Sequence, residues 1–161
     1  MEKAAVPQRI NDSAISQTIE AGLARFSEIL RDRDVYQSVE DWSYWILENL
    51  VEYVNGLQAA MYLTPESEPN QLVIAGTYGI DLSAVQKQLA WGEGLVGQAA
   101  KSGRRFLLQQ NGSMEVEATT GLGKLKPRML IIQPLISEER VEGVLEICSL
   151  YTFDLTQREF I

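Results

Sequence analysis

MLIIQPLISEERVEGVLEICSLYTF, residues 129–153, is the stretch that decides the fold. Its aliphatic and β-branched residues form two runs, 128–137 and 141–150, with the polar residues Glu138, Glu139 and Arg140 between them. Runs of this composition on either side of a short polar segment are typical of a β-hairpin. We therefore expect two central antiparallel strands joined by a three-residue loop.

A three-residue loop also determines which residues of this hairpin face each other. It pairs Ile132 with Glu146 and Leu130 with Cys148. Side chains alternate between the two faces of a strand, so these four residues point to the same side of the sheet. Glu146 is then a carboxylate on a face that is otherwise largely apolar.

A second hairpin is predicted upstream, where LQAAMYL (57–63) and LVIAGTY (72–78) flank the turn Pro-Glu-Ser-Glu-Pro-Asn. Alternation along its first strand places Ala60 and Tyr62 on one face, and the opposite face carries Ala59, Met61 and Leu63. Residues 104–108 read as one more short strand. The chain thus supplies several antiparallel strands and no repeated parallel βαβ unit.

Two amphipathic helices are expected before the first strand. The first has apolar residues at three- and four-residue steps behind the capping candidates Asn11, Asp12 and Ser13: Ile15, Ile19, Leu23, Phe26 and Leu30. The second is capped by Ser38, ends at Asn55 and Gly56, and carries a stripe of Val39, Trp42, Ile46, Leu50 and Tyr53. One sheet covers only one side of such stripes, so we expect a homodimer through the terminal helices, with packing inside one chain as the alternative.

The remaining segments read as connections. Residues 79–88 form a short helical connection with Asp81 as its cap, a glycine turn leads into a helix over 94–103, and residues 109–126 form a loop with one helical turn near 115–120. Asp154 caps a final helix that the end of the chain cuts short. We expect a flexible tail over 1–10, helices for packing and dimerisation over 11–55, an α+β core over 56–153, and the start of a C-terminal signalling helix over 154–161.

Composition excludes several classes of protein. The formal net charge of -8 disfavours nucleic acid as a partner, because a phosphate backbone would be repelled. No apolar stretch reaches the roughly 20 residues of a membrane span, and the N-terminus lacks the apolar core of a signal peptide. One cysteine, Cys148, allows no internal disulfide. A cytoplasmic domain without membrane contact is expected.

The region from Gly56 to Phe153 resembles GAF domains, which share a fold with PAS domains and profilin. Three stretches carry the likeness: LQAAMYL with LVIAGTYGID, the turn and helix WGEGLVGQAAKSGRRFLL, and the hairpin with its Pro134-Leu135 and Gly143-Val144-Leu145. The resemblance implies an antiparallel six-stranded sheet with the terminal helices on one face and a ligand cavity with short helices on the other. It also implies a regulatory, small-molecule-sensing role in a signalling protein such as a histidine kinase.

Candidate cofactors and reactions find little support in the residues. The absence of histidine removes the usual proximal haem ligand, the commonest metal ligand and the usual general base. GEGLVG (92–97) satisfies G-x-G-x-x-G, but no parallel βαβ unit surrounds it, so the glycines are interpreted as the turn into a helix. Cys148 lies in mid-strand, where a small buried hydrophobe is the better interpretation than a nucleophile.

The resemblance also names chemistries that this chain lacks residues for. Free methionine-(R)-sulfoxide reductases of this fold need cysteines around the glycine turn and the segment after it, where this chain has Trp91, Gly92 and residues 109–126. Bilin-binding members attach the chromophore beyond the glycine turn, and Cys148 lies on another element. Cyclic-nucleotide binders carry an Asn-Lys-x-Asp-Glu set that is not found here. No haem, bilin or metal cofactor is expected, and the chain is expected not to be an enzyme.

What remains is a generic pocket for an unknown small molecule. The candidate ligand-binding residues are Tyr62, Tyr78, Trp91, Leu95, Leu130, Ile132, Glu146 and Cys148. Glu146 would meet a cationic or amine ligand, or else lie near an open sheet edge or pair with Arg105 or Arg128. A structural dimerisation module that binds nothing is the alternative to a sensor.

Overall fold

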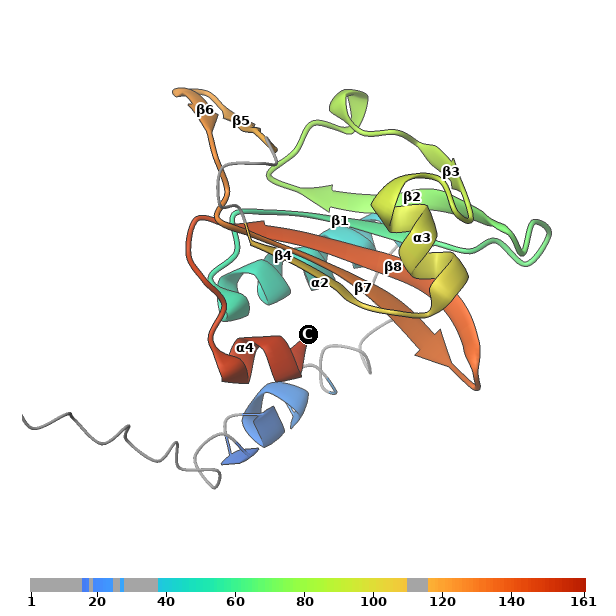
Figure 1. Cartoon of the computed structure of the whole chain (residues 1–161), viewed down its shortest axis with the longest axis horizontal. Coiled ribbons are helices and arrows are strands. Elements are labelled where there is room, and N and C mark those ends of the chain that lie inside the picture. Colours follow the sequence, from blue (N-terminus) through green and yellow to red (C-terminus); the bar gives the residue numbers. More distant parts are fainter. Residues whose placement is uncertain (1–15, 18, 25–26, 28–37, 110–115) are drawn as a thin grey trace, which may run out of the picture.

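An antiparallel sheet with helices against one face organises the chain (Figure 1). The computed structural model describes residues 16–17, 19–24, 27, 38–109 and 116–161. Within these residues the main sheet has six strands in the order β3-β2-β1-β8-β7-β4, and each neighbouring pair is antiparallel. The strands are β1 Gln58–Leu63, β2 Gln71–Tyr78, β3 Gln88–Ala90, β4 Phe106–Gln109, β7 Met129–Ser137 and β8 Arg140–Ser149. The α+β prediction is confirmed.

The helices of the described residues lie on both sides of this sheet. Apart from the helical residues before Ser38, they are α2 Val39–Val54, the short 3-10 helix η2 Leu82–Ala84, α3 Gly94–Ser102 and α4 Leu155–Phe160. Figure 1 shows α2 and α4 on one face of the sheet and α3 on the other, as the prediction required. A separate two-stranded hairpin, β5 Ala118–Thr120 and β6 Gly123–Leu125, extends away from the sheet.

Helix α2 has the predicted caps, but the predicted stripe is confirmed only in part: Ile46 and Leu50 are buried, Trp42 and Tyr53 are partly buried, and Val39 is 50% exposed. The Ser38 side chain accepts a hydrogen bond of 3.1 Å from the Asp41 N–H, and Asn55 ends the helix in the left-handed conformation at φ 56°. The apolar stripe faces the sheet and buries Ile46, Leu47, Leu50, Val51 and Val54.

The first predicted helix is described only in part. Residues 16, 17, 19–24 and 27 are helical, and Leu23 of the predicted stripe is exposed. The capping candidates Asn11, Asp12 and Ser13, the stripe residues Ile15, Phe26 and Leu30, and the tail over 1–10 lie outside the described residues.

Helix α4 is tied to the end of α2. Asp154 and Gln157 form a capping box, which confirms the predicted cap. The Gln157 side chain also donates to the Val54 carbonyl over 2.9 Å, and the rings of Tyr53 and Phe160 lie 4.5 Å apart. The terminal helical segments therefore meet at one place, on the face of the sheet opposite α3.

The sheet separates two apolar layers. Beneath α2 and α4 lies the helix-side layer, which includes Ala59, Met61, Met129, Ile131, Leu145, Ile147 and Phe153. Under α3 and the η2 segment lies the cavity-side layer, which includes Ala60, Tyr62, Leu72, Leu130, Ile132, Val144 and Cys148. The alternation predicted for 57–63 is therefore confirmed.

The β7–β8 hairpin reaches the predicted register by a different route. The turn contains two residues, Glu138 and Glu139, both at positive φ, so the predicted three-residue loop is wrong. A bulge at Glu142 then makes up the missing residue, since Ile136 pairs with Val141 but Leu135 pairs with Gly143. Beyond this bulge Ile132 faces Glu146 and Leu130 faces Cys148, as predicted.

Three predictions for the connecting segments need correction. The helical turn expected near 115–120 is strand β5, paired with β6, while residues 110–115 lie outside the description. The strand expected over 104–108 begins two residues later at Phe106. The helix expected over 79–88 is only η2, with Asp81 as its cap as predicted, and edge strand β3 follows it.

No helix in the described part of the chain is long and apolar enough to cross a membrane.

Candidate functional site

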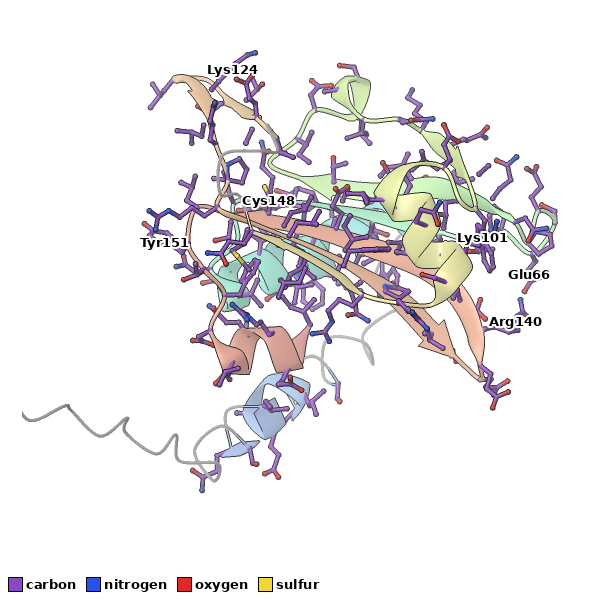
Figure 2. All side chains as sticks on the ribbon, viewed as in Figure 1. Glu66, Lys101, Lys124, Arg140, Cys148 and Tyr151 are labelled. Atoms are coloured by element: carbon purple, nitrogen blue, oxygen red, sulfur yellow. The ribbon has the colours of Figure 1, made fainter. Side chains whose placement is uncertain are left out.

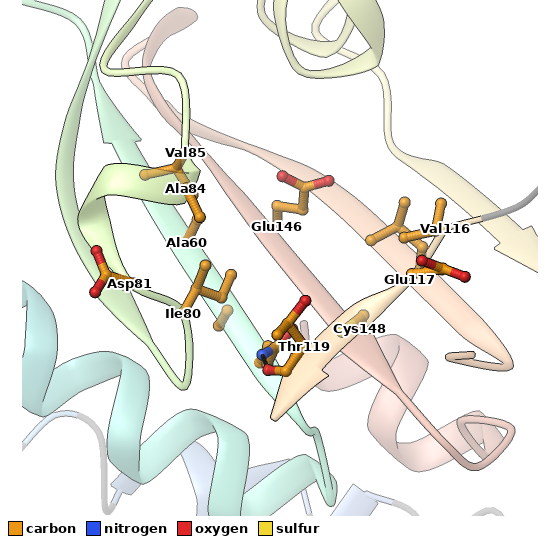
Figure 3. Close-up of a pocket in the computed structure, with 13 residues that line it drawn as sticks. Ala60, Ile80, Asp81, Ala84, Val85, Val116, Glu117, Thr119, Glu146 and Cys148 are labelled. Atoms are coloured by element: carbon orange, nitrogen blue, oxygen red, sulfur yellow. Dashed lines mark hydrogen bonds between the residues drawn. The ribbon is translucent and has the colours of Figure 1, made fainter. Parts of the chain in front are cut away.

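A cavity of about 490 Å³ lies on the cavity side of the sheet, near the ends of β1 and β8 (Figure 3). Strands β1, β7 and β8 form its floor, the segment around η2 forms one wall, and the segment leading into β5 forms the other. It is lined by Gln58, Ala59, Ala60, Ile80, Asp81, Ala84, Val85, Val116, Glu117, Thr119, Leu130, Glu146 and Cys148. This size is within the range of small-molecule sites.

Gln58 connects the floor of the cavity to both walls. Its side-chain N–H group donates to the Gly79 carbonyl over 2.5 Å and to the Thr119 carbonyl over 3.2 Å. Gln58 is 8% exposed, so these bonds satisfy a buried amide. They also fix the distance between the η2 segment and the β5–β6 hairpin at one end of the cavity.

Glu146 is the polar group at the centre of the floor. It lies on β8, an interior strand, between Ala60 of β1 and Ile132 of β7. Figure 3 shows its carboxylate rising between the wall that carries Val85 and the wall that carries Val116. The side chain is half-buried, and burial raises the pKa of its carboxyl above the ordinary value.

No described residue pairs with Glu146 or donates a hydrogen bond to it. The two arginines considered as partners bond elsewhere: Arg105 donates to the Gln133 side chain over 2.6 Å, and the exposed Arg128 donates its backbone N–H to Ser149. The expectation of an arginine partner is therefore wrong, and so is that of an open sheet edge, because β8 has neighbours on both sides. A desolvated carboxylate without a partner is unfavourable until something binds it.

The charges that line the cavity are all negative among the described residues. Besides Glu146, the cavity is lined by Asp81, which accepts from the Ser83 N–H over 2.7 Å, and Glu117, which pairs with Lys124 over 2.6 Å. These contacts hold the pKa of each of those two carboxyls below its usual range. No group of three acids, cysteines or histidines among the described residues converges well enough to hold a metal ion.

Tyr62 and Cys148 flank Glu146 as neutral groups. The Tyr62 hydroxyl donates to the Gln86 carbonyl over 3.1 Å, and burial, followed by the nearby charge of Glu146, raises the pKa of Tyr62 to about 12. Burial is also the main reason that the pKa of the Cys148 thiol rises to about 11. Cys148 is thus a buried thiol with almost no thiolate at neutral pH, as the mid-strand position predicts.

The structure brings together only part of the predicted set of ligand-binding residues. Leu130, Glu146 and Cys148 line the cavity, and Tyr62 and Ile132 are buried beside it. Leu95 is 39% exposed on α3 and lies outside the cavity lining. Trp91 borders a second, more open depression, together with Lys101 and Arg140 at the far end of α3 (Figure 2).

Tyr78 lies on the helix side, away from the cavity. A bulge in the β1–β2 pair explains this placement: Tyr62 faces Ile74, but Met61 faces Gly76, so Ala75 is the extra residue. Beyond the bulge the alternation of β2 is reversed, and the Tyr78 ring lies 5.9 Å from that of Tyr44 in α2. The signal for this bulge in LVIAGTY is Gly76, because an isolated glycine inside a strand pattern often marks a bulge.

The walls of the cavity are the residues that sequence reasoning missed. Ile80, Ala84, Val85, Val116 and Thr119 come from segments that are mostly short and irregular, so no periodicity marks the side that faces the cavity. Asp81 carried a signal only as a helix cap, a role it also has in the structure.

The glycines of GEGLVG form the turn into helix α3, as predicted from the sequence. Gly92 and Gly94 have positive φ values of 93° and 60°. Gly97 lies against the Ala90 carbonyl and the Gly92 backbone, where a side chain would collide. The Gly97 N–H donates to the Glu93 carbonyl over 2.9 Å, and the Gly97 carbonyl accepts from the Gly92 N–H over 2.7 Å.

Replacing Glu146 by glutamine is expected to raise stability at neutral and alkaline pH. Burial raises the pKa of the carboxyl in the folded state, so the favourable contribution of its protonated form is fully present below about pH 4.5 and is lost as the pH rises through the folded-state pKa. Removing an unpaired charge should stabilise the protein by about 1 kcal/mol at pH 8, or about 2–4 °C in Tm. The gain should shrink toward pH 4, as measured by thermal unfolding across pH.

Glu142→Gln is the matched control for that experiment. Glu142 lies on the same strand but pairs with Arg140 over 3.6 Å outside the cavity. It should change Tm by less than about 1 °C at any pH, because exposed ion pairs contribute little. A Glu146→Gln gain that is the same at pH 4 and pH 8 would contradict the assignment.

The six-stranded antiparallel sheet, with terminal helices on one face and a cavity on the other, defines an α+β domain built on a single sheet. The chain belongs to the GAF domain family, because the family model described as GAF domain matches residues 37–161. The family resemblance inferred from the sequence is confirmed.

Solved structures agree with this assignment at low sequence identity. The GAF domain of a phosphoenolpyruvate-protein phosphotransferase (ptsP) from Coxiella burnetii is similar with a TM-score of 0.65, 17% identity, and coverage of 94% of this chain and 88% of that one. The A. aeolicus nlh2 GAF domain in an inactive state has a TM-score of 0.66, 20% identity, and coverage of 91% and 88%.

An enzyme is also among the similar structures. Free methionine-R-sulfoxide reductase from Neisseria meningitidis, in complex with its substrate, has a TM-score of 0.56 and 18% identity, and the match covers 99% of this chain and 86% of that one. At these identities the likeness shows the fold alone. The comparison with curated proteins gave no match.

Proposed function

We propose that this chain is a regulatory GAF domain that binds a small molecule and transmits binding through its terminal helices to an output domain. The observation that carries the proposal is the cavity of about 490 Å³ whose floor holds the unpaired carboxylate of Glu146. A polar group that lacks a partner in a largely apolar recess is typical of a site that a ligand completes.

Strand β8 supplies a direct route from the cavity to the helices. Glu146 and Cys148 line the cavity, while the alternate residues Leu145 and Ile147 pack in the helix-side layer. At the last residue of this strand, the Ser149 hydroxyl donates to the Asn55 carbonyl over 2.8 Å at the end of α2. A ligand that shifts β8 would therefore act on α2 and α4 through packed contacts.

The residues favour sensing over catalysis. Cys148 is the only cysteine of the chain, the chain has no histidine, and a thiol with a pKa of about 11 is a poor nucleophile at neutral pH. The setting we propose is a cytoplasmic signalling protein, such as a histidine kinase. The match to the GAF domain family supports a regulatory setting of this general kind.

A thermal-shift screen against amines, amino acids, 2-oxo acids, nucleotides and common metabolites tests binding. A ligand at 100 times its dissociation constant should stabilise the protein by about 2.7 kcal/mol, which raises Tm by about 5–10 °C. Coupling can be read from tryptophan fluorescence. Trp91 lies on the cavity side, so Trp91→Phe leaves only Trp42 and Trp45 of α2 to report.

Two results would contradict the proposal. A complete lack of stabilisation by the panel would favour a dimerisation module without a ligand, which the exposed apolar residues Leu23, Val39 and Tyr44 on the helical side also fit. Stabilisation without any change in the α2 fluorescence of Trp91→Phe would separate binding from signalling. Sedimentation of the protein with and without ligand measures whether the helices form a homodimer.

A further inference from the structure

The floor of the cavity holds one carboxylate that has no partner among the described residues. Glu146 projects into the cavity from an interior strand, and none of the described residues donates a hydrogen bond or pairs with it. A buried carboxylate is stabilised most by a charge-assisted hydrogen bond from a cationic N–H group. The protein supplies no such donor among its described residues, so the ligand is the remaining source.

The rest of the lining rejects negative charge. Asp81 and Glu117 stand on opposite walls, and the described lining contains no lysine or arginine. Their own partners, the Ser83 N–H and Lys124, already satisfy them. Lys124 is exposed on the β5–β6 hairpin and directed away from the sheet (Figure 2). A ligand carboxylate or phosphate would therefore meet the negative charges of Glu146 and Asp81, a Glu117 whose charge is offset by Lys124, and no cation within the described lining.

The shape of the lining distinguishes between kinds of cation. No aromatic side chain lines the cavity among the described residues, so the aromatic cage that binds quaternary ammonium groups is absent there. The apolar walls, which include Ile80, Val85 and Val116, and Leu130 on the floor suit a compact hydrocarbon body. The acids do not converge as metal ligands in the described residues, which disfavours a divalent ion.

We propose that the ligand of this cavity is a small organic amine with N–H donors and an apolar body, bound through Glu146, and that neither amino-acid zwitterions nor quaternary ammonium ions are accepted. This inference rests on the proposed sensory function and specifies its ligand class. Recognition is by one charge-assisted hydrogen bond at the floor and by apolar contact with the walls.

Two matched series of probes test the charge rule by calorimetry at pH 8. The first contains isoamylamine, isoamyl alcohol, isoamyltrimethylammonium, leucine and isocaproate, and the second contains the corresponding phenethyl compounds. The amine should bind at least about tenfold more tightly than every other member of its series, because only the amine brings a cationic N–H donor without a carboxylate that the acidic lining would repel. An amine that binds no better than its alcohol in both series would overturn the proposal.

Two variants test whether Glu146 is the group that binds the amine. Glu146→Gln should weaken amine binding at least about tenfold and leave alcohol binding within about twofold, since the amide keeps the shape and loses the charge. The matched control Glu142→Gln should leave both affinities unchanged, because Glu142 lies outside the lining. Equal weakening by the two variants would exclude Glu146 as the recognition group.

The pH dependence in the unaltered protein is an independent check that needs no variant. The groups around Glu146 are Tyr62 and Cys148, whose pKa values of about 12 and 11 keep them neutral, and Asp81 and Glu117, whose pKa values are lowered and keep them charged. Strand β7 adds only apolar residues there, Leu130 and Ile132. Amine affinity should rise from pH 5 to pH 8 as Glu146 loses its proton, and a flat or falling affinity would overturn the proposal.

These experiments separate the two proposals. If a carboxylate, a nucleotide or a neutral metabolite stabilises the protein and the amines do not bind, the amine assignment is wrong and the sensory function stands. If no compound of any charge stabilises the protein, both proposals fail.

Discussion

Replacing Ile147 by alanine is expected to lower the free energy of unfolding by about 3–4 kcal/mol. The side chain is 0% exposed in the helix-side layer, where β8 lies between β1 and β7. Truncation removes apolar contacts and leaves a cavity that a paired central strand cannot collapse to fill. Urea unfolding followed by circular dichroism should show the loss as a lower midpoint with an unchanged slope.

Ile136→Ala is the matched control for this prediction. It removes the same atoms from the same hairpin, but Ile136 is 54% exposed near the turn. Its cost should be below about 1 kcal/mol. Equal losses in the two variants would show that the helix-side layer does not hold the domain together as described.

Replacing Gly97 by alanine is expected to cost roughly 2–3 kcal/mol, which is about 4–12 °C in Tm. An added Cβ would meet the Ala90 carbonyl oxygen and would lie 3.0 Å from the Gly92 nitrogen, and both are backbone atoms that no rotamer change can move. To accommodate it, α3 must shift away from the turn that precedes it. That shift would also disturb the 2.7 Å bond between the Gly92 N–H and the Gly97 carbonyl.

Gly121→Ala is the control for the glycine experiment. Gly121 lies in the exposed β5–β6 turn, where an added Cβ meets nothing within 4 Å. Thermal unfolding of the two variants should differ by several degrees. If Gly97→Ala proves as stable as Gly121→Ala, close packing is not the reason for glycine at position 97.

The sequence predicted the parts of the fold that rest on repeated apolar spacing. The α2 stripe and the two faces of β1 and β8 are set by periodicity over six residues or more. The β7–β8 register was correct although the turn was not, because one bulge residue compensates for one turn residue. The two-residue turn could not be predicted, because its residues are Glu138 and Glu139, whereas asparagine, aspartate and glycine are the usual residues of turns with positive φ.

The short strands and the walls of the cavity could not be predicted, for a different reason. Strands β3, β5 and β6 have three residues each, too few to show alternation, and β6 is fully exposed. For the site, the floor residues Leu130, Glu146 and Cys148 follow from the alternation of two long strands. The side of the chain on which Tyr78 lies depends on a bulge at Ala75, and the walls depend on loop geometry that only the folded structure reveals.

The place of β8 in the sheet has a consequence for biosynthesis. Strand β8 lies between β7 and β1, the first strand of the sheet. The β1–β8 pair therefore joins residues that are far apart in the sequence, such as Ala59 and Ile147. During translation β1 and β2 emerge early, but β1 waits with one unpaired edge until Ser149 has left the ribosome. Closing so long a loop is slow, and the exposed edge is open to association meanwhile. Helix α4 follows directly, so its packing site is completed only as the helix itself is being made.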